Sequence, residues 1–110
     1  MTQKPVVLRG RARHDIDEAI DHYSTVATAA VVLALIDALE ATFRQVAEHP
    51  ASGSPPRYAD ELALPGLRSL VVKGFPHLVF YVEREADIDV WRVLHAARDI
   101  PAWLREPPND

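Results

Sequence analysis

The sequence contains no cysteine and no long apolar run. The lack of cysteine excludes disulfides, thiolate zinc sites and cysteine nucleophiles. A helix that spans a membrane needs about 18 or more consecutive apolar residues, and no stretch of this chain approaches that length. Residues 1–13, MTQKPVVLRGRAR, also lack the apolar core and the small-residue cleavage site of a signal peptide. We therefore expect a cytoplasmic protein without membrane contact.

A basic excess is absent as well, since the formal net charge is −4. Residues 1–13 contain four basic residues and no acid, whereas residues 14–61 contain nine acids against only Arg44 and Arg57. Proteins that hold a nucleic-acid backbone by themselves usually carry a basic excess, because neutralisation of phosphates dominates their affinity. We therefore expect no direct sequence-specific binding of nucleic acid.

What is present is the composition of one folded domain. The 110 residues are 48% apolar and 25% charged, which suffices to bury a single core without covalent cross-links. The sequence contains no internal repeat and no low-complexity tract. We expect a single domain over residues 1–110.

The first half of the chain predicts a short strand and two helices. Residues 4–9 contain the β-branched run of the strand, and from Ala12 apolar residues recur at helical spacings of three and four. The same spacing continues over residues 29–48, and Pro50 ends this second helix. Its apolar stripe is wide, so we expect it to pack on two sides, against the first helix and against a sheet. The residues that widen the stripe are Val31, Leu33 and Leu35.

Residues 67–104 predict a meander of three antiparallel strands. The apolar runs LRSLVV, HLVFYVE and DIDVWRVLH are separated by Gly74, Pro76 and the charged residues 83–87. A proline-rich connection at residues 50–65 precedes the meander, and a helical turn at residues 99–104 follows it. The predicted fold class is α+β in the order β-α-α-β-β-β with a short final helix. A helical hairpin then packs on a mainly antiparallel sheet.

The two turns of the meander predict which residues lie opposite each other. Turns centred on residues 74–75 and 85–86 place Leu70 opposite Phe80, Phe80 opposite Arg92, and His77 opposite His95. Alternation along the strands then gives the face of Phe80 to the helices and leaves the face of His77 for a partner. A slip of one residue in the pairing would exchange the faces of a strand. The partner face would carry Ser69, Val71, Lys73, His77, Val79, Tyr81, Trp91, Val93 and His95.

Several stretches together resemble a known family. They are the acidic first helix with Tyr23, the motif AEHPASGSP at residues 47–55, the pair LR at residues 67–68, the strand HLVFYV at residues 77–82, and RVLHAARD at residues 92–99. Their order over nearly the whole chain resembles the ParE/RelE superfamily of toxins from bacterial type II toxin–antitoxin modules, and it is closer to the ParE branch. The resemblance implies the same β-α-α-β-β-β fold.

The resemblance implies two possible activities. ParE proteins poison DNA gyrase without known catalytic chemistry, whereas RelE proteins are ribosome-dependent messenger RNA endonucleases. A nuclease needs a base, a proton donor and cations around one phosphate. No tyrosine follows Tyr81 and the chain ends in LREPPND, unlike RelE enzymes, so we favour a gyrase inhibitor without catalytic residues over a nuclease. A non-toxic antitoxin-binding homologue is a third possibility. The nuclease alternative would use His95, Tyr81, Lys73, Arg92 and Arg98.

Several of these residues also have structural interpretations. Tyr81 and Trp91 are equally consistent with core aromatics, and Arg68 and Arg92 with ion pairs to helix carboxylates such as Asp37 or Glu40. His77 and His95 have no third ligand nearby in the sequence, so we expect no metal and no cofactor.

The resemblance also implies a partner. Toxins of this kind are neutralised by a ParD-like antitoxin whose C-terminal segment folds on the toxin and buries apolar surface. The expected partner-binding residues are Val31, Leu35, Lys73, His77, Tyr81, Trp91, His95 and Trp103.

Overall fold

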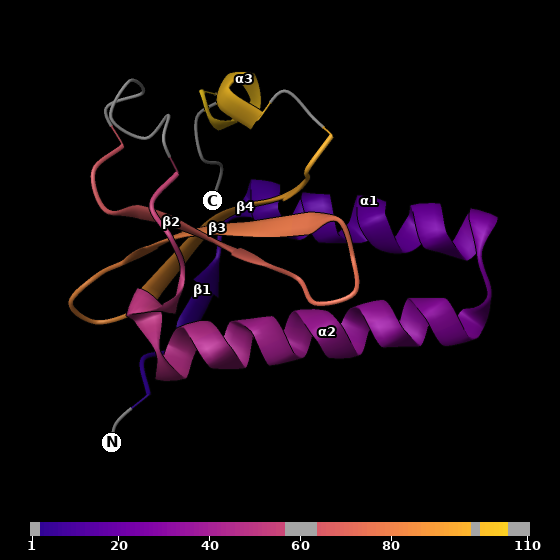
Figure 1. The fold of residues 1–110 in the computed structure, drawn as a ribbon, viewed down its shortest axis with the longest axis horizontal. Helices are drawn as coiled ribbons and strands as arrows, with labels where there is room; N and C mark the ends of the chain where they lie inside the picture. Colours follow the sequence, from indigo (N-terminus) through magenta and orange to yellow (C-terminus); the bar gives the residue numbers. More distant parts are fainter. Residues whose placement is uncertain (1–2, 57–63, 98–99, 106–110) are drawn as a thin grey trace.

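In the computed structural model, which describes residues 3–56, 64–97 and 100–105, four strands form one mixed sheet (Figure 1). The strands are β1 (Val6–Leu8), β2 (Leu67–Val71), β3 (His77–Glu83) and β4 (Ile88–His95), in the spatial order β1-β4-β3-β2. The last three are antiparallel neighbours, as expected, while β1 runs parallel to β4. The expected α+β fold is confirmed.

Two long helices form an antiparallel hairpin. α1 (Gly10–Val26) and α2 (Ala29–Glu48) are joined by only two residues. The second of these, Thr28, accepts a hydrogen bond from the backbone N–H of Val31 through its hydroxyl (3.4 Å), and so caps the start of α2. Figure 1 shows the two helices running side by side, with their connection at one end of the molecule.

The two long helices cover one face of the sheet, which we call the inner face. The cluster between helices and sheet includes Leu35 and Leu39 of α2 with Val79, Tyr81 and Val90 of the strands. The opposite, outer face is covered by the short helix α3 (Ile100–Leu104). Its cluster contains Leu67, Phe80, Leu94, Ile100 and Leu104.

The pairing of the strands confirms one part of the predicted register and corrects another. Phe80 lies opposite Arg92, and His77 lies opposite His95, as predicted. Leu70, however, lies opposite Val79 and not opposite Phe80, so that prediction is wrong by one residue. The turn between β2 and β3 is centred on residues 74–75, with Gly74 at φ +85°, and antiparallel strands around that centre require the observed pairing.

This shift also reverses the predicted faces of β3. Directly opposite residues share a face, so Leu70 places Val79, and with it Tyr81, on the inner face. A bulge in β4 then changes the alternation, because Tyr81 pairs with Val90 while Phe80 pairs with Arg92, which leaves Trp91 as the extra residue. The expectation that Phe80 packs against the long helices is therefore wrong. Phe80 lies on the outer face.

Among the helices that the structure describes, none has the length and apolarity that crossing a membrane requires.

Candidate functional site

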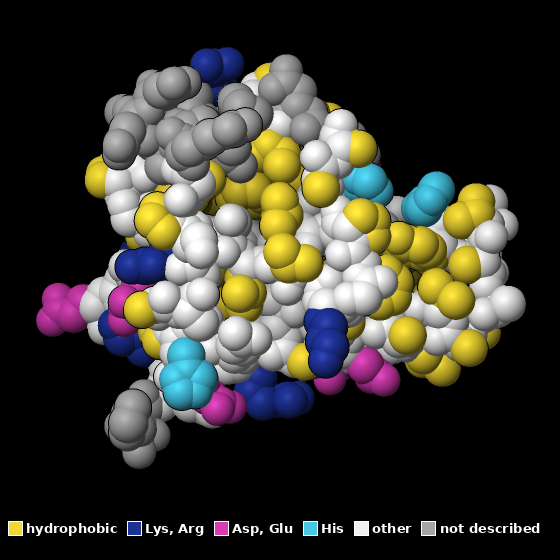
Figure 2. Space-filling view, in the orientation of Figure 1, with side chains coloured by type: hydrophobic (Ala, Val, Ile, Leu, Met, Phe, Trp, Pro, Cys, Tyr) yellow, Lys and Arg dark blue, Asp and Glu magenta, His cyan; other side chains and the backbone are white. Residues whose placement is uncertain are grey.

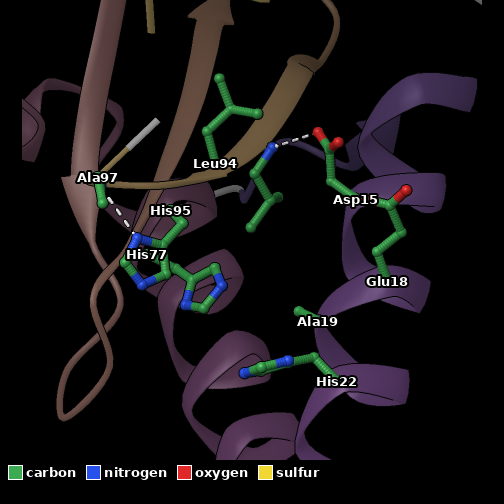
Figure 3. Close-up of a pocket in the computed structure, with 9 residues that line it drawn as sticks. Asp15, Glu18, Ala19, His22, His77, Leu94, His95 and Ala97 are labelled. Carbon is green, nitrogen blue, oxygen red and sulfur yellow. Dashed lines mark hydrogen bonds between the residues drawn. The ribbon is translucent and has the colours of Figure 1, made fainter. Parts of the chain in front are cut away.

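A groove of about 480 Å³ lies between α1 and the ends of β3 and β4 (Figure 3). It brings together groups that can carry charge from three elements, α1, β3 and β4, of which α1 is far from the other two in the sequence. Its floor is apolar, with carboxylates on the helix side and imidazoles on both sides. The residues that line it are Asp15, Glu18, Ala19, His22, His77, Val93, Leu94, His95 and Ala97.

Two facing histidines lie at the sheet side of this groove. The rings of His77 and His95 are 5.2 Å apart, edge to face, and His77 is only 7% exposed. The Nδ1 atom of His95 accepts a hydrogen bond from the backbone N–H of Ala97 at 3.0 Å, so the neutral ring carries its proton on Nε2. Tyr23 of α1 lies against His77, with 6.2 Å between ring centroids. Within the described ranges, no group of three or more potential ligands could hold a metal ion.

A buried ion pair joins α1 to β4 beside the groove. Two nitrogens of Arg92, Nε and Nη2, donate to the two carboxylate oxygens of Asp15 at 2.8 Å each. Asp15 Oδ2 also accepts the backbone N–H of Val93 at 3.0 Å. The remaining Nη1 of Arg92 donates to the carbonyl oxygen of Trp103 in α3, and the guanidinium lies 5.1 Å from the Trp103 ring centroid. The structure thus gives Arg92 the structural role that the sequence suggested.

The partners proposed for Arg92 and Arg68 were wrong, however. Asp37 and Glu40 are exposed on α2, and Arg92 pairs with Asp15 of the first helix instead. Arg68 donates to the carbonyl oxygen of Gly53 at 2.7 Å.

Tyr81 is buried at the inner face and holds the connection that follows α2. This connection starts with the short 3-10 helix η1 (Pro50–Ser52). The hydroxyl of Tyr81 donates to the carbonyl oxygen of Pro50 at 2.6 Å and accepts the backbone N–H of Gly53 at 2.9 Å. Burial raises the pKa of the phenol, although the hydrogen bond from Gly53 acts in the opposite direction.

The residues required by the nuclease alternative are not assembled at one place in the described structure. His95 lines the groove, but none of Tyr81, Arg92 and Lys73 does. Tyr81 is buried and hydrogen-bonded to the connection after α2, and Arg92 is buried in its ion pair with Asp15 beside the groove. Lys73 is exposed in the turn after β2. Arg98 lies outside the described residues.

The expected partner-binding residues are divided between core and surface. Leu35 and Tyr81 have no exposed surface, and His77 is buried. Val31, Trp91, His95 and Trp103 are half-buried, and Lys73 is exposed. The indole N–H of Trp91 donates to Asp89 Oδ2 at 3.0 Å.

Sequence reasoning missed an apolar surface at the tip of the helical hairpin. Val26 at the end of α1 and Leu33 near the start of α2 are 63% and 61% exposed. The apolar stripe of α2 is wider than the sheet and α1 can cover, so the prediction of two-sided packing is wrong for Leu33. The position of Leu33 in the helix could have revealed this surface, because Leu33 lies outside the buried row of Leu35, Leu39 and Val46.

Comparison with known proteins identifies the family. A family model described as "ParE toxin of type II toxin-antitoxin system, parDE" matches residues 6–100. Ten chains of solved structures match, among them "Chromosomal ParDE TA system from P. aeruginosa", which is 17% identical, has a TM-score of 0.71, and covers 84% of this chain and 96% of its own. That likeness supports the fold. No curated protein sequence matches. The match over residues 6–100, which span every strand and both long helices, shows that the chain belongs to the ParE toxin family of type II toxin–antitoxin systems.

Proposed function

We propose that this ParE-family toxin inhibits DNA gyrase and is neutralised by a ParD-like antitoxin. The observation that carries the proposal is the family match over residues 6–100, because the ParE branch that the sequence resembles acts on gyrase. The solved relative is described as a ParDE system, which supports a ParD-like partner for this chain too.

The geometry of the candidate nuclease residues favours an inhibitor over an RNA-cleaving enzyme. General acid–base cleavage needs a base, a proton donor and cations within hydrogen-bond reach of one phosphate. Here the hydroxyl of Tyr81 is hydrogen-bonded to the backbone of Pro50 and Gly53. The guanidinium of Arg92 is hydrogen-bonded to the carboxylate of Asp15 and to the carbonyl oxygen of Trp103. Both side chains therefore serve the fold in this structure.

The antitoxin contacts that we propose are those expected residues that keep accessible surface. A segment that folds on binding gains affinity by burying apolar side chains, and aromatic residues contribute most at such contacts. The proposed contacts are Val31, Lys73, Trp91, His95 and Trp103.

Purified protein tests the target directly. We expect it to inhibit supercoiling by DNA gyrase, or to trap cleaved DNA on the enzyme, and to leave ribosome-bound messenger RNA intact. Relaxation by a type I topoisomerase serves as the control and should not change. Cleavage of messenger RNA that is lost in His95→Ala would contradict the proposal. His95→Ala is a cleaner test than Tyr81→Phe, because the Tyr81 hydroxyl also anchors the connection after α2.

Calorimetry with the ParD-like protein tests the second part. Folding of a partner segment on apolar surface should give a large negative heat-capacity change on binding. A heat-capacity change near zero would contradict a buried contact.

A further inference from the structure

The tip of the helical hairpin carries an apolar surface that no other described element covers. We define the hairpin tip patch as Val26, Ala29, Ala30, Leu33 and Ala34, all of which are exposed. Positions 30, 33 and 34 lie on one side of α2, since helical neighbours are three and four residues apart. Figure 2 shows hydrophobic side chains gathered at this end of the molecule. Four large apolar side chains of the described structure are exposed, and two of them, Val26 and Leu33, belong to this patch.

The charge around the hairpin tip patch is of one sign. Residues 14–43 contain six acidic residues and no Lys or Arg. Arg92 neutralises Asp15 inside the protein, whereas the other five acids are exposed. Asp37 lies one helical turn beyond Leu33, and Asp21 lies in the last two turns of α1 before Val26. The patch is therefore an apolar spot with acidic surroundings.

The negative charge around the hairpin tip patch limits which proteins can bind to it. A second copy of the chain would bring an equally acidic hairpin against the first, and like charges at close range cost binding energy. An occupant with Lys and Arg around an apolar contact would instead be attracted. A protein that holds DNA has such surfaces, because its affinity depends on neutralising phosphates.

We infer that the hairpin tip patch is the surface that meets the target enzyme, and that it docks on a basic, DNA-holding region of gyrase. The inference rests on the proposed function. Val26 and Leu33 supply the apolar contact, and Asp21 and Asp37 face Lys or Arg side chains of the target. The antitoxin contacts proposed above are other residues. Val31 lies next to the patch on α2, whereas Lys73, Trp91, His95 and Trp103 lie on the strands, a turn and α3.

Two kinds of variant test the inference with purified gyrase. Leu33→Asp places a charge in the apolar contact, and we expect about 30-fold more protein to be needed for half-inhibition of supercoiling. Asp21→Lys combined with Asp37→Lys reverses the charge, and we expect a loss of about tenfold that shrinks as salt is added. All three positions are exposed, so the melting temperature should stay close to that of the parent protein.

The chain offers matched controls for both changes. Val71 is 61% exposed, like Leu33, so Val71→Asp makes the same change away from the hairpin. Glu85, in the turn between β3 and β4, and Glu48, at the far end of α2, are exposed acids, so Glu85→Lys combined with Glu48→Lys matches the change in net charge. Both control variants should inhibit gyrase as the parent protein does. Should Leu33→Asp fail to fold, Val26→Asp makes the equivalent change at the end of α1.

The outcomes separate this inference from the proposed function. If the parent protein does not inhibit gyrase, the proposed function fails, and the inference fails with it. If the parent protein inhibits gyrase and the hairpin variants inhibit it equally well, only the inference is overturned. It is also overturned if those variants keep inhibition and lose antitoxin binding, because the patch would then be an antitoxin site.

Discussion

The two faces of the sheet are closed in different ways. The inner face is covered by α1 and α2, of 17 and 20 residues, and the largest fully buried side chains there include Tyr81 and Leu35. The outer face is covered by α3, which has five residues and closes a smaller cluster around Phe80 and Leu94. Arg92 contacts both covers, through Asp15 on α1 and Trp103 on α3. From this difference we expect global stability to depend mainly on the inner face and the outer cover to open locally.

Equal truncations on the two faces test this difference most strongly. Leu35 of α2 is 0% exposed and Leu104 of α3 is 3% exposed, so both Leu→Ala changes remove a buried side chain. We expect Leu35→Ala to lower the free energy of unfolding by about 4 kcal/mol and Leu104→Ala by about 2 kcal/mol, because a short helix relaxes more easily around a cavity. Urea unfolding measures both. Exposed Leu33→Ala is the control, with a change within about 0.5 kcal/mol. Equal losses at both sites would remove the distinction between the faces.

The residue that joins the faces should give the next largest effect. Asp15→Asn keeps the size of the side chain but removes the charge opposite buried Arg92. An uncompensated buried charge is costly, and we expect a loss of about 3 kcal/mol in the free energy of unfolding. Asp17→Asn, an exposed change on the same helix, is the matched control. If urea unfolding shows that Asp15→Asn lowers the free energy of unfolding by less than about 1 kcal/mol, the Arg92 guanidinium is reached by water in that variant.

The two faces of the sheet also show how much of the fold the sequence predicts. The helical spacing over residues 12–27 and 29–48, the β-branched run at residues 4–9 and the apolar runs of residues 67–104 predicted every main element, because such patterns are local. The pairing of His77 with His95 depends on the bulge at Trp91, since a turn centred on residues 85–86 alone would place His77 opposite Leu94. The faces of β3 depended on a shift of one residue, and those of β4 on the same bulge, and neither leaves a local signal.

The site was predicted less well for the same reason. The ion pair of Asp15 and Arg92 joins residues 77 positions apart in the chain, so only the fold brings them together. The apolar stripe of α2 as a whole gave no indication that part of it is exposed. Leu35 is buried, whereas Leu33, two residues earlier, is exposed.

A smaller effect is expected where the inner face holds the connection after α2. Tyr81→Phe leaves the backbone N–H of Gly53 and the carbonyl of Pro50 without the hydroxyl, which should cost about 1.5 kcal/mol. Hydrogen exchange should quicken in residues 50–54 and stay unchanged in α3. Gly53→Ala should act in the same direction, because its Cβ would lie 2.9 Å from the carbonyl oxygen of Ser69 and against the Tyr81 ring. Unchanged exchange at residues 50–54 would contradict the anchoring role of Tyr81.

The smallest effect should come from the ion pair of Arg9 and Asp89, which includes no residue of α1, α2 or α3. Burial alone would raise the pKa of Asp89, yet hydrogen bonds from Arg9 and Trp91 and the charge of Arg9 hold it below the ordinary value of 3.8. A lowered pKa in the folded state means that the pair stabilises the protein above the unfolded-state pKa and loses this effect as pH falls through the folded-state pKa. Asp89→Asn should therefore cost about 1 kcal/mol at pH 7 and flatten the fall of stability below about pH 5.

Unfolding measured between pH 3 and pH 7 checks this prediction. Asp87→Asn, at a less buried neighbouring carboxylate, should leave most of the pH dependence in place. An unchanged slope in Asp89→Asn would show that other carboxylates account for the acid sensitivity.

The carboxylate of Asp15 has one more consequence, which concerns the edge of the sheet. β1 pairs only with Ile88, Asp89 and Val90, so the second half of β4 extends past it. There the backbone N–H of Val93 donates to Asp15 and not to another strand. Uncovered strand edges are templates for pairing with other chains. Asp15 and Val93 are both buried, so α1 covers this part of the β4 edge, and one carboxylate takes the place of the carbonyl that a further strand would offer.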